Sequence, residues 1–114
     1  MTLSNLEREI LAWFSVNAGS KELSVQCSTA SVVSRTHTGP GQITCLLAAP
    51  DAPMANFPTN CVPNAPLIES PLLPWGACAD LWLKDGKIVE LEIVTLGGQE
   101  LPTLEFPFKL VDAL

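Results

Sequence analysis

The chain has 114 residues, enough for one compact domain and too few for two independent hydrophobic cores. Apolar side chains make up 47% of the residues and charged ones only 16%, which excludes a disordered chain. Twelve acidic against six basic residues give a formal charge of −6, and this argues against a nucleic-acid-binding surface, because such surfaces are basic. We therefore expect a single acidic domain over residues 1–114.

The N-terminal sequence does not read as an export signal. Glu7, Arg8 and Glu9 interrupt the first apolar run, whereas a secretory signal needs an unbroken apolar stretch of about 7–15 residues. The chain also lacks the run of about 18 apolar residues that indicates a membrane span. We expect a cytoplasmic protein that has neither membrane nor nucleic-acid partners.

Four cysteines, Cys27, Cys45, Cys61 and Cys78, are spaced too widely for a C-x-x-C motif. In a cytoplasmic protein we expect reduced thiols rather than disulfides. A zinc site formed by these residues and His37 is an alternative, but the ligand spacing typical of such sites is missing. We prefer to interpret the cysteines as small buried apolar residues, with no bound metal or cofactor.

The segment 3–28 is predicted to form one or two helices. Ser4 and Glu7 have the S-x-x-E spacing of a capping box, and Gly19 can end the first helix in the left-handed conformation. A second, short helix is predicted to start at Ser20. The side chains expected to face the core are Leu3, Leu6, Ile10, Trp13 and Phe14 or Asn17 of the first helix, and Leu23 and Cys27 of the second.

A first hairpin is predicted over residues 32–49, where Gly39-Pro40-Gly41 separates two stretches rich in β-branched and apolar residues. We favour a four-residue loop that extends through Gln42 and pairs Thr38 with Ile43, because a three-residue loop mixes charge into the apolar face. The expected apolar face consists of Val32, Ser34, Thr36, Ile43, Cys45 and Leu47, and the opposite face of Arg35, His37 and Thr44.

Residues 50–75 contain seven prolines, at positions 50, 53, 58, 63, 66, 71 and 74. Because proline lacks the N–H that a ladder needs, we expect a long loop with no central strand and at most a short edge strand at Leu67–Glu69. Phe57 and Trp75 are expected to pack back onto the body of the protein, since exposed aromatic side chains are costly in water.

A second hairpin is predicted over residues 78–96. A two-residue turn would set Leu81 opposite Glu90 and bury that charge, so we predict a three-residue loop ending in a left-handed Gly86. This register pairs Asp80 with Glu90. The expected inner face consists of Ala79, Leu81, Leu83, Val89, Leu91 and Ile93, and the outer face of Cys78, Asp80, Trp82, Ile88, Glu90, Glu92 and Val94.

Residues 103–110 alternate apolar and polar side chains, and Pro107 in the polar set predicts an edge strand. The expected fold class is therefore α+β: an antiparallel sheet of about five strands, formed by two hairpins and this C-terminal edge strand. One or two N-terminal helices pack on one face of the sheet.

The predicted outer face of the second hairpin has two interpretations. In the first, the loop 50–75 or the N-terminal helix covers Trp82, and the neighbouring carboxylates are merely solvated. In the second, Asp80, Trp82, Glu90 and Glu92 form an interface in which Trp82 anchors a basic protein partner. The charge distribution favours the interface, because residues 69–112 carry eight acidic and three basic side chains and so dominate the electric field.

Motifs that carry chemistry are missing. His37 is the only histidine and has no nucleophile or acid near it in a known arrangement, and no nucleophile-elbow, P-loop or H-E-x-x-H motif occurs. Glu90 and Glu92 could serve as a catalytic carboxylate pair, but carboxylates on the same face of one strand are more often solvated. We predict a protein that is not an enzyme.

Two segments carry a resemblance to known proteins. Residues 35–44 and 51–53, RTHTGPGQIT and DAP, resemble the T-G-x-G-x-x-T hairpin of a group of small bacterial proteins of uncharacterised function. Residues 68–70 and 85–93, IES and DGKIVELEI, resemble a later part of the same group. The chain departs from the group at Gln42 and Ile43, where aromatic residues are usual. The likeness covers somewhat more than half of the chain and implies a shared fold rather than a reaction.

In size, acidity and lack of catalytic motifs, the chain also resembles the immunity proteins of bacterial toxin systems, including those of contact-dependent inhibition. This resemblance implies a binding protein that neutralises a cognate toxin domain. The alternative is a small-molecule-binding or accessory domain in which residues 50–75 form a lid over a pocket lined by Phe57, Trp75 and Trp82.

Overall fold

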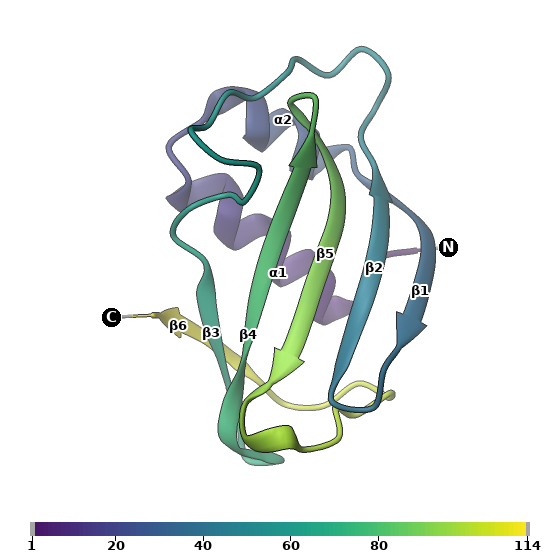
Figure 1. Ribbon diagram of the computed structural model, residues 1–114, viewed down its shortest axis with the longest axis vertical. Helices are drawn as coiled ribbons and strands as arrows, with labels where there is room; N and C mark the ends of the chain where they lie inside the picture. Colours follow the sequence, from purple (N-terminus) through teal and green to yellow (C-terminus); the bar gives the residue numbers. More distant parts are fainter. Residues whose placement is uncertain (1, 114) are drawn as a thin grey trace.

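Two helices cover one face of an antiparallel sheet in the computed structural model, which describes residues 2–113 (Figure 1). The six strands follow the order β1-β2-β5-β4-β3-β6. The predicted α+β class is confirmed, although the sheet has six strands rather than about five. The elements are α1 (Asn5–Asn17), α2 (Lys21–Ser28), β1 (Ser31–His37), β2 (Gly41–Leu47), β3 (Pro66–Ser70), β4 (Leu73–Lys84), β5 (Lys87–Thr95), a 3₁₀ turn (Leu96–Gly98) and β6 (Lys109–Asp112).

The two predicted helices and their caps are confirmed. The hydroxyl of Ser4 accepts a hydrogen bond from the Glu7 backbone N–H at 3.1 Å, and the Glu7 carboxylate accepts one from the Ser4 N–H at 2.7 Å. Gly19, with φ +70°, separates the helices, and the Ser20 hydroxyl caps α2 by accepting from the Leu23 N–H at 3.1 Å. These local hydrogen bonds satisfy backbone donors that a helix start otherwise leaves unpaired.

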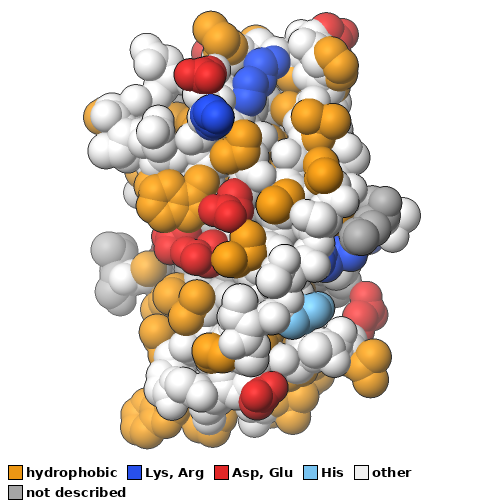
Figure 2. Space-filling view, turned by 45° about the vertical axis from the view of Figure 1, so that its right-hand side comes forward, with side chains coloured by type: hydrophobic (Ala, Val, Ile, Leu, Met, Phe, Trp, Pro, Cys, Tyr) orange, Lys and Arg blue, Asp and Glu red, His pale blue; other side chains and the backbone are white. Residues whose placement is uncertain are grey.

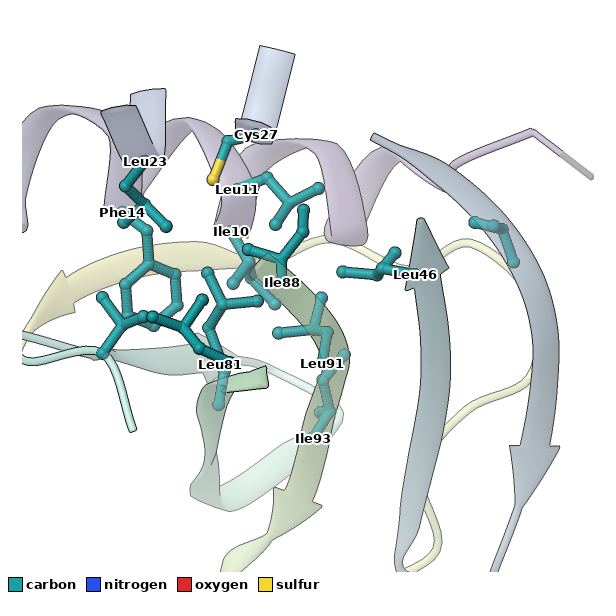
Figure 3. Packing of buried hydrophobic residues seen from close by; sticks show 14 of the residues in the cluster. Ile10, Leu11, Phe14, Leu23, Cys27, Leu46, Leu81, Ile88, Leu91 and Ile93 are labelled. Carbon is teal, nitrogen blue, oxygen red and sulfur yellow. The ribbon is translucent and has the colours of Figure 1, made fainter. Parts of the chain in front are cut away.

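The core lies between the helices and the inner face of the central strands (Figure 3). Ile10 and Phe14 of α1 and Leu23 of α2 are fully buried against this face. Trp13, predicted to be in the core, is only half-buried, and its indole N–H donates to the Asn64 carbonyl at 2.9 Å. The buried side chains of β4 and β5 are Leu73, Ala77, Ala79, Leu81, Leu83, Ile88, Leu91, Ile93 and Thr95.

The turn of the second hairpin differs from the prediction. Asp85 and Gly86 form a two-residue turn with φ values of +52° and +78°, the backbone that type I′ turns require. A β-bulge at Val89 then shifts the register by one residue, so Leu81 pairs with Leu91 and not with Glu90. A two-residue turn was expected to set Leu81 opposite Glu90 and bury the Glu90 charge. Because of the bulge, the turn has two residues and Glu90 still faces outward.

This corrected register alters two further assignments. Ile88, predicted to face outward, is buried, and Val89, predicted to face inward, is half-exposed. Asp80 pairs with Glu92 rather than with Glu90. Otherwise the separation between the aliphatic inner row and the acidic outer row of β4 and β5 is confirmed.

In the first hairpin the predicted faces are reversed. His37 pairs with Gln42, and Thr44 is buried, whereas Ile43 is half-exposed and Leu47 is 58% exposed. The polar face turns inward because it meets the buried carboxylate of Glu7. A register shift between Val32 and Ser34 returns Val32 to the interior, opposite Leu46.

The proline-rich segment contributes more to the sheet than predicted. β3 lies between β4 and β6 and is therefore not an edge strand, and β4 extends back through Pro74 to Leu73. Proline is accommodated because Pro66 is the first residue of β3. The edge strand is β6, which pairs with β3 and starts two residues after Pro107, so the strand predicted at 103–110 is wrong in its bounds.

No helix among the described residues is long and apolar enough to cross a membrane.

Candidate functional site

Within residues 2–113, no helix or strand covers the sheet face opposite the helices (Figure 1). Its centre is formed by the outward side chains of β4 and β5, namely Asp80, Trp82, Glu90 and Glu92, which we term the acidic block. All four side chains are half-buried. The structure thus brings together the four residues that the sequence indicates for partner binding, although in a different pairing.

The acidic block is a two-by-two array on neighbouring strands. Asp80 lies opposite Glu92, and Trp82 lies opposite Glu90. Side chains that face each other across a sheet are about 5 Å apart at Cβ, and alternate residues along a strand are about 7 Å apart. Because Asp80 and Glu92 carry the same charge, their direct pairing is repulsive.

No cation neutralises these three carboxylates within the described part of the chain, since its only ion pair joins Glu7 and Arg35 on the opposite side of the sheet. The nearest lysines along the strands, Lys84 and Lys87, pair with each other at the hairpin end. Lys87 is engaged there, because its ammonium group donates to the Ala52 carbonyl. The acidic block therefore presents uncompensated negative charge.

Hydrophobic side chains and thiols border the acidic block (Figure 2). Ile43 of β2 pairs with Glu92, and Cys45 pairs with Glu90. On the other side, Cys61 forms an isolated β-bridge with Trp82. The figure shows acidic side chains at the middle of this face with hydrophobic groups around them, and basic groups toward the upper end.

Trp82 remains accessible despite this border. The backbone of Asn60 accepts from the Leu83 N–H at 2.7 Å, and Val62 donates to the Leu81 carbonyl at 2.9 Å, so this part of the loop runs beside β4. It extends the sheet at its edge rather than crossing over the face. The Trp82 side chain is therefore half-buried beside the loop and is not fully enclosed by it.

Two thiols beside the acidic block, those of Cys61 and Cys78, are held in their protonated form. Burial, the charge of Asp80 and a hydrogen bond to it, with Cys61 Sγ 3.9 Å from the carboxylate oxygen, all raise the pKa of Cys61. Burial and the charges of Asp80 and Glu92 likewise raise the pKa of Cys78. A protonated thiol is a poor nucleophile, so this arrangement favours binding over thiol chemistry.

The cysteines occupy two environments. All four are free, but only Cys27 is buried, and its burial raises the pKa of its thiol to about 11. The prediction that the cysteines are buried apolar residues is thus wrong for Cys45, Cys61 and Cys78. Within residues 2–113, no three histidine, cysteine or acidic side chains are grouped as metal ligands, and the zinc alternative gains no support.

The alternative pocket is not assembled. Trp75 is 71% exposed, and it lies seven residues before Trp82 on the same strand, a span of about 23 Å. A Cβ placed on Gly97 would lie 2.7 Å from the indole of Trp75. Trp75 therefore packs against the 3₁₀ turn and not beside Trp82. Phe57 is half-buried against the core, as expected.

A buried polar cluster was not predicted from the sequence. The fully buried Glu7 carboxylate accepts hydrogen bonds from Arg35 at 2.6 and 2.7 Å, from Gln42 at 2.9 Å and from Thr44 at 2.7 Å. Burial alone would raise the pKa of Glu7, but the hydrogen bonds of Arg35, Ser4 and Thr44 outweigh it and hold the pKa at about 2, below the ordinary 4.5.

The sequence does contain a signal for this cluster. Glu7 lies three residues before Ile10 and four before Leu11, which places it on the buried stripe of α1. A carboxylate on such a stripe needs a buried partner, and Arg35 and Thr44 stand at paired positions of one hairpin face. All the polar contacts of Glu7 are internal, so its role is structural.

A second feature missed from the sequence is a groove of about 690 Å³ between α1 and residues 106–110. Trp13 and Val16 form one wall, and Phe106, Phe108 and Leu110 form much of the other. The sequence signal for this groove was Val16, an apolar residue outside the buried stripe of α1, whose side chain is 79% exposed.

Comparison of the chain with protein-family models, curated proteins and solved structures finds no significant match.

Proposed function

We propose that this chain is a binding protein whose acidic block receives a basic protein partner, and that it acts as an immunity protein that neutralises a bacterial toxin domain. The observation that carries the proposal is the open sheet face, where a half-buried tryptophan stands among three carboxylates that form no ion pair with any described residue. Aromatic anchors at the centre of an interface often supply most of its binding free energy.

Electrostatics supports a basic partner. Eight of the twelve acidic residues lie in the segment 69–112, which forms most of the sheet. This excess of negative charge accelerates the encounter with a positively charged surface and gives the association rate a strong dependence on salt. A toxin domain that cleaves nucleic acids is expected to be basic, because it must bind the negatively charged phosphate backbone. Such a surface would complement the acidic block.

The chemistry of the face also favours binding over catalysis. The thiols of Cys61 and Cys78 are protonated at neutral pH, and the exposed His37 lies on β1, two strands away from β5. The proposal therefore assigns no catalytic residue and no cofactor. The toxin is inhibited by occlusion of its active surface.

A comparative pull-down tests the proposal. The bait is the full chain, compared with a Glu90→Lys/Glu92→Lys variant and with a Glu100→Lys/Glu105→Lys variant of the same net charge, in which the altered glutamates are exposed away from the block. We expect a stoichiometric basic protein to be retained by the wild type and by the Glu100/Glu105 control, and to be lost with the Glu90/Glu92 variant.

The captured protein is then expressed alone and together with each variant. If it is a toxin, the wild type restores growth and the Glu90/Glu92 variant does not. Equal capture by all three baits would show that the acidic block is not part of the binding surface. A captured partner that is acidic, or that has no toxic effect, would refute the immunity function.

A further inference from the structure

We propose that Gln26 of α2 is a positioning residue that fixes where β5 bulges, and so keeps Ile88 in the core and off the open sheet face. The side chain of Gln26 is fully buried, although its amide carries two N–H donors and an acceptor. These groups all bind backbone atoms of other segments. The inference concerns the hairpin itself and does not depend on the proposed function.

The amide of Gln26 joins α2 to two other segments of the chain. Its Nε2 donates to the carbonyls of Pro53 at 2.8 Å and of Gly86 at 2.7 Å, and its Oε1 accepts from the Ile88 N–H at 2.8 Å. The Gly86 carbonyl also accepts from the Ala55 N–H at 2.9 Å. The turn of the second hairpin is therefore held both by α2 and by the segment that follows β2.

Gln26 acts where the sheet no longer supports β5 from the side of β2. The ladder between these two strands ends at the Cys45–Glu90 pair, so Ile88 lies beyond it. Gln26 takes the place of a strand partner there, because its amide offers a carbonyl and an N–H in the same way as a peptide unit. A buried polar group without partners is costly, so the amide favours the backbone conformation that supplies them.

Two positions of the bulge are compatible with the rest of the hairpin. In the structure the extra residue is Val89, between the Leu83–Ile88 and Trp82–Glu90 pairs. The extra residue could instead enlarge the turn, which would pair Leu83 with Val89 and leave the Trp82–Glu90 pair in place. Ile88 would then point outward and its N–H would turn away from α2, because successive residues of a strand alternate. Only the observed bulge keeps this N–H on the buried amide.

The test locates the bulge by NMR in the full chain and in Gln26→Met, which keeps the length of the side chain and removes its hydrogen bonds. In the wild type we expect cross-strand NOEs between Leu83 and Ile88. In Gln26→Met we expect NOEs between Leu83 and Val89 in their place, and about tenfold faster hydrogen exchange of the Ile88 N–H. Leu23→Ala truncates another fully buried side chain of α2 and controls for a general loss of stability, so it should keep the wild-type NOEs.

Deletion of Val89 provides a second, independent variant. The deletion removes the extra residue and leaves the other side chains of β5 on their faces, so the two-residue turn alone then sets the register. In this background we expect Gln26→Met to keep Leu83 opposite Ile88. Folding of Gln26→Met only when Val89 is deleted would also support the inference.

Three results would overturn the inference. If Gln26→Met keeps the Leu83–Ile88 NOEs and the slow exchange of the Ile88 N–H, the turn places the bulge without help from α2. If Leu23→Ala also moves the bulge, the cause is lost stability and not the amide. If Gln26→Met folds in neither background, Gln26 supports the fold as a whole. None of these experiments includes a partner, so the pull-down still decides the proposed function separately.

Discussion

Glu7 joins the start of α1 to the first hairpin through a buried ion pair with Arg35, 28 residues away in the chain. Replacing Glu7 with glutamine removes the carboxylate charge beside the Arg35 guanidinium, at a site where only 22% of the Arg35 side chain is exposed. We expect the free energy of unfolding to fall by about 3 kcal/mol, because removing one partner of a largely buried ion pair is strongly destabilising. Urea unfolding measures this, with exposed Glu9→Gln of the same helix as the control.

The same residue predicts a dependence of stability on pH. The pKa of Glu7 is about 2 in the folded chain, against an ordinary value of 4.5, so its contribution is present above pH 4.5 and is lost as the pH falls toward 2. The contribution is on the order of 3 kcal/mol. Urea unfolding between pH 2 and 7 should show this loss in the wild type, and a much smaller loss in Glu7→Gln. Parallel curves for the two proteins would contradict the assignment.

Asp80 illustrates a conflict between stability and function. Asp80→Asn removes the repulsion from Glu92, so we expect the free chain to become more stable by a few tenths of a kcal/mol. The pKa of Cys61 should fall as well, since the Asp80 charge contributes to raising it. Thermal unfolding and the pH dependence of thiol alkylation measure the two effects. A loss of stability would show that Asp80 serves the fold rather than the face.

At the level of the elements, the tip of the second hairpin is held by the segment that follows β2. A Cβ on Gly86 would lie 2.9 Å from the Met54 side chain and 3.0 Å from the Ala55 carbonyl, whereas a Cβ on Gly98 meets nothing within 4 Å. Both glycines have φ near +75°, at +78° and +73°.

This pair of glycines gives a controlled test of the contact. Gly86→Ala should destabilise the chain by more than Gly98→Ala, which carries only the cost of the left-handed backbone, on the order of 1 kcal/mol. The difference between the two measured free energies of unfolding reports the steric contact with residues 54 and 55. Equal losses would mean that the turn and this segment are not packed together.

Local patterns predicted the helices, their caps and the alternation of β4 and β5, because each of these depends on neighbours in the sequence. The bulges at Val33 and Val89 were not predictable in this way, because each shifts the inward–outward alternation by one residue and neither position carries a glycine that would mark a bulge. The reversed faces of the first hairpin have a similar origin. Their orientation is set by Glu7, which lies in a different element.

For the candidate site, the outward direction of Asp80, Trp82, Glu90 and Glu92 followed from alternation alone. Their pairing did not, because the bulge at Val89 changes which carboxylates face each other.

The position of β3 inside the sheet could not be predicted from the neighbouring sequence either. It depends on β6, about 40 residues later in the chain, returning to cover the outer edge of β3.

In the whole molecule, one face of the sheet packs against the helices and the core (Figure 1), and the other carries the acidic block (Figure 2). The account depends on the open face being a docking surface for a basic protein. Its most direct test is the association rate constant with the captured partner, measured by stopped-flow mixing between low and high ionic strength.

For the wild type we predict fast association that slows steeply as salt is added. Glu90→Lys/Glu92→Lys should lower the rate constant at low salt about tenfold or more and flatten its dependence on salt, while Glu100→Lys/Glu105→Lys should change both much less. Indistinguishable rate constants and salt slopes for the wild type and the Glu90/Glu92 variant would contradict the account.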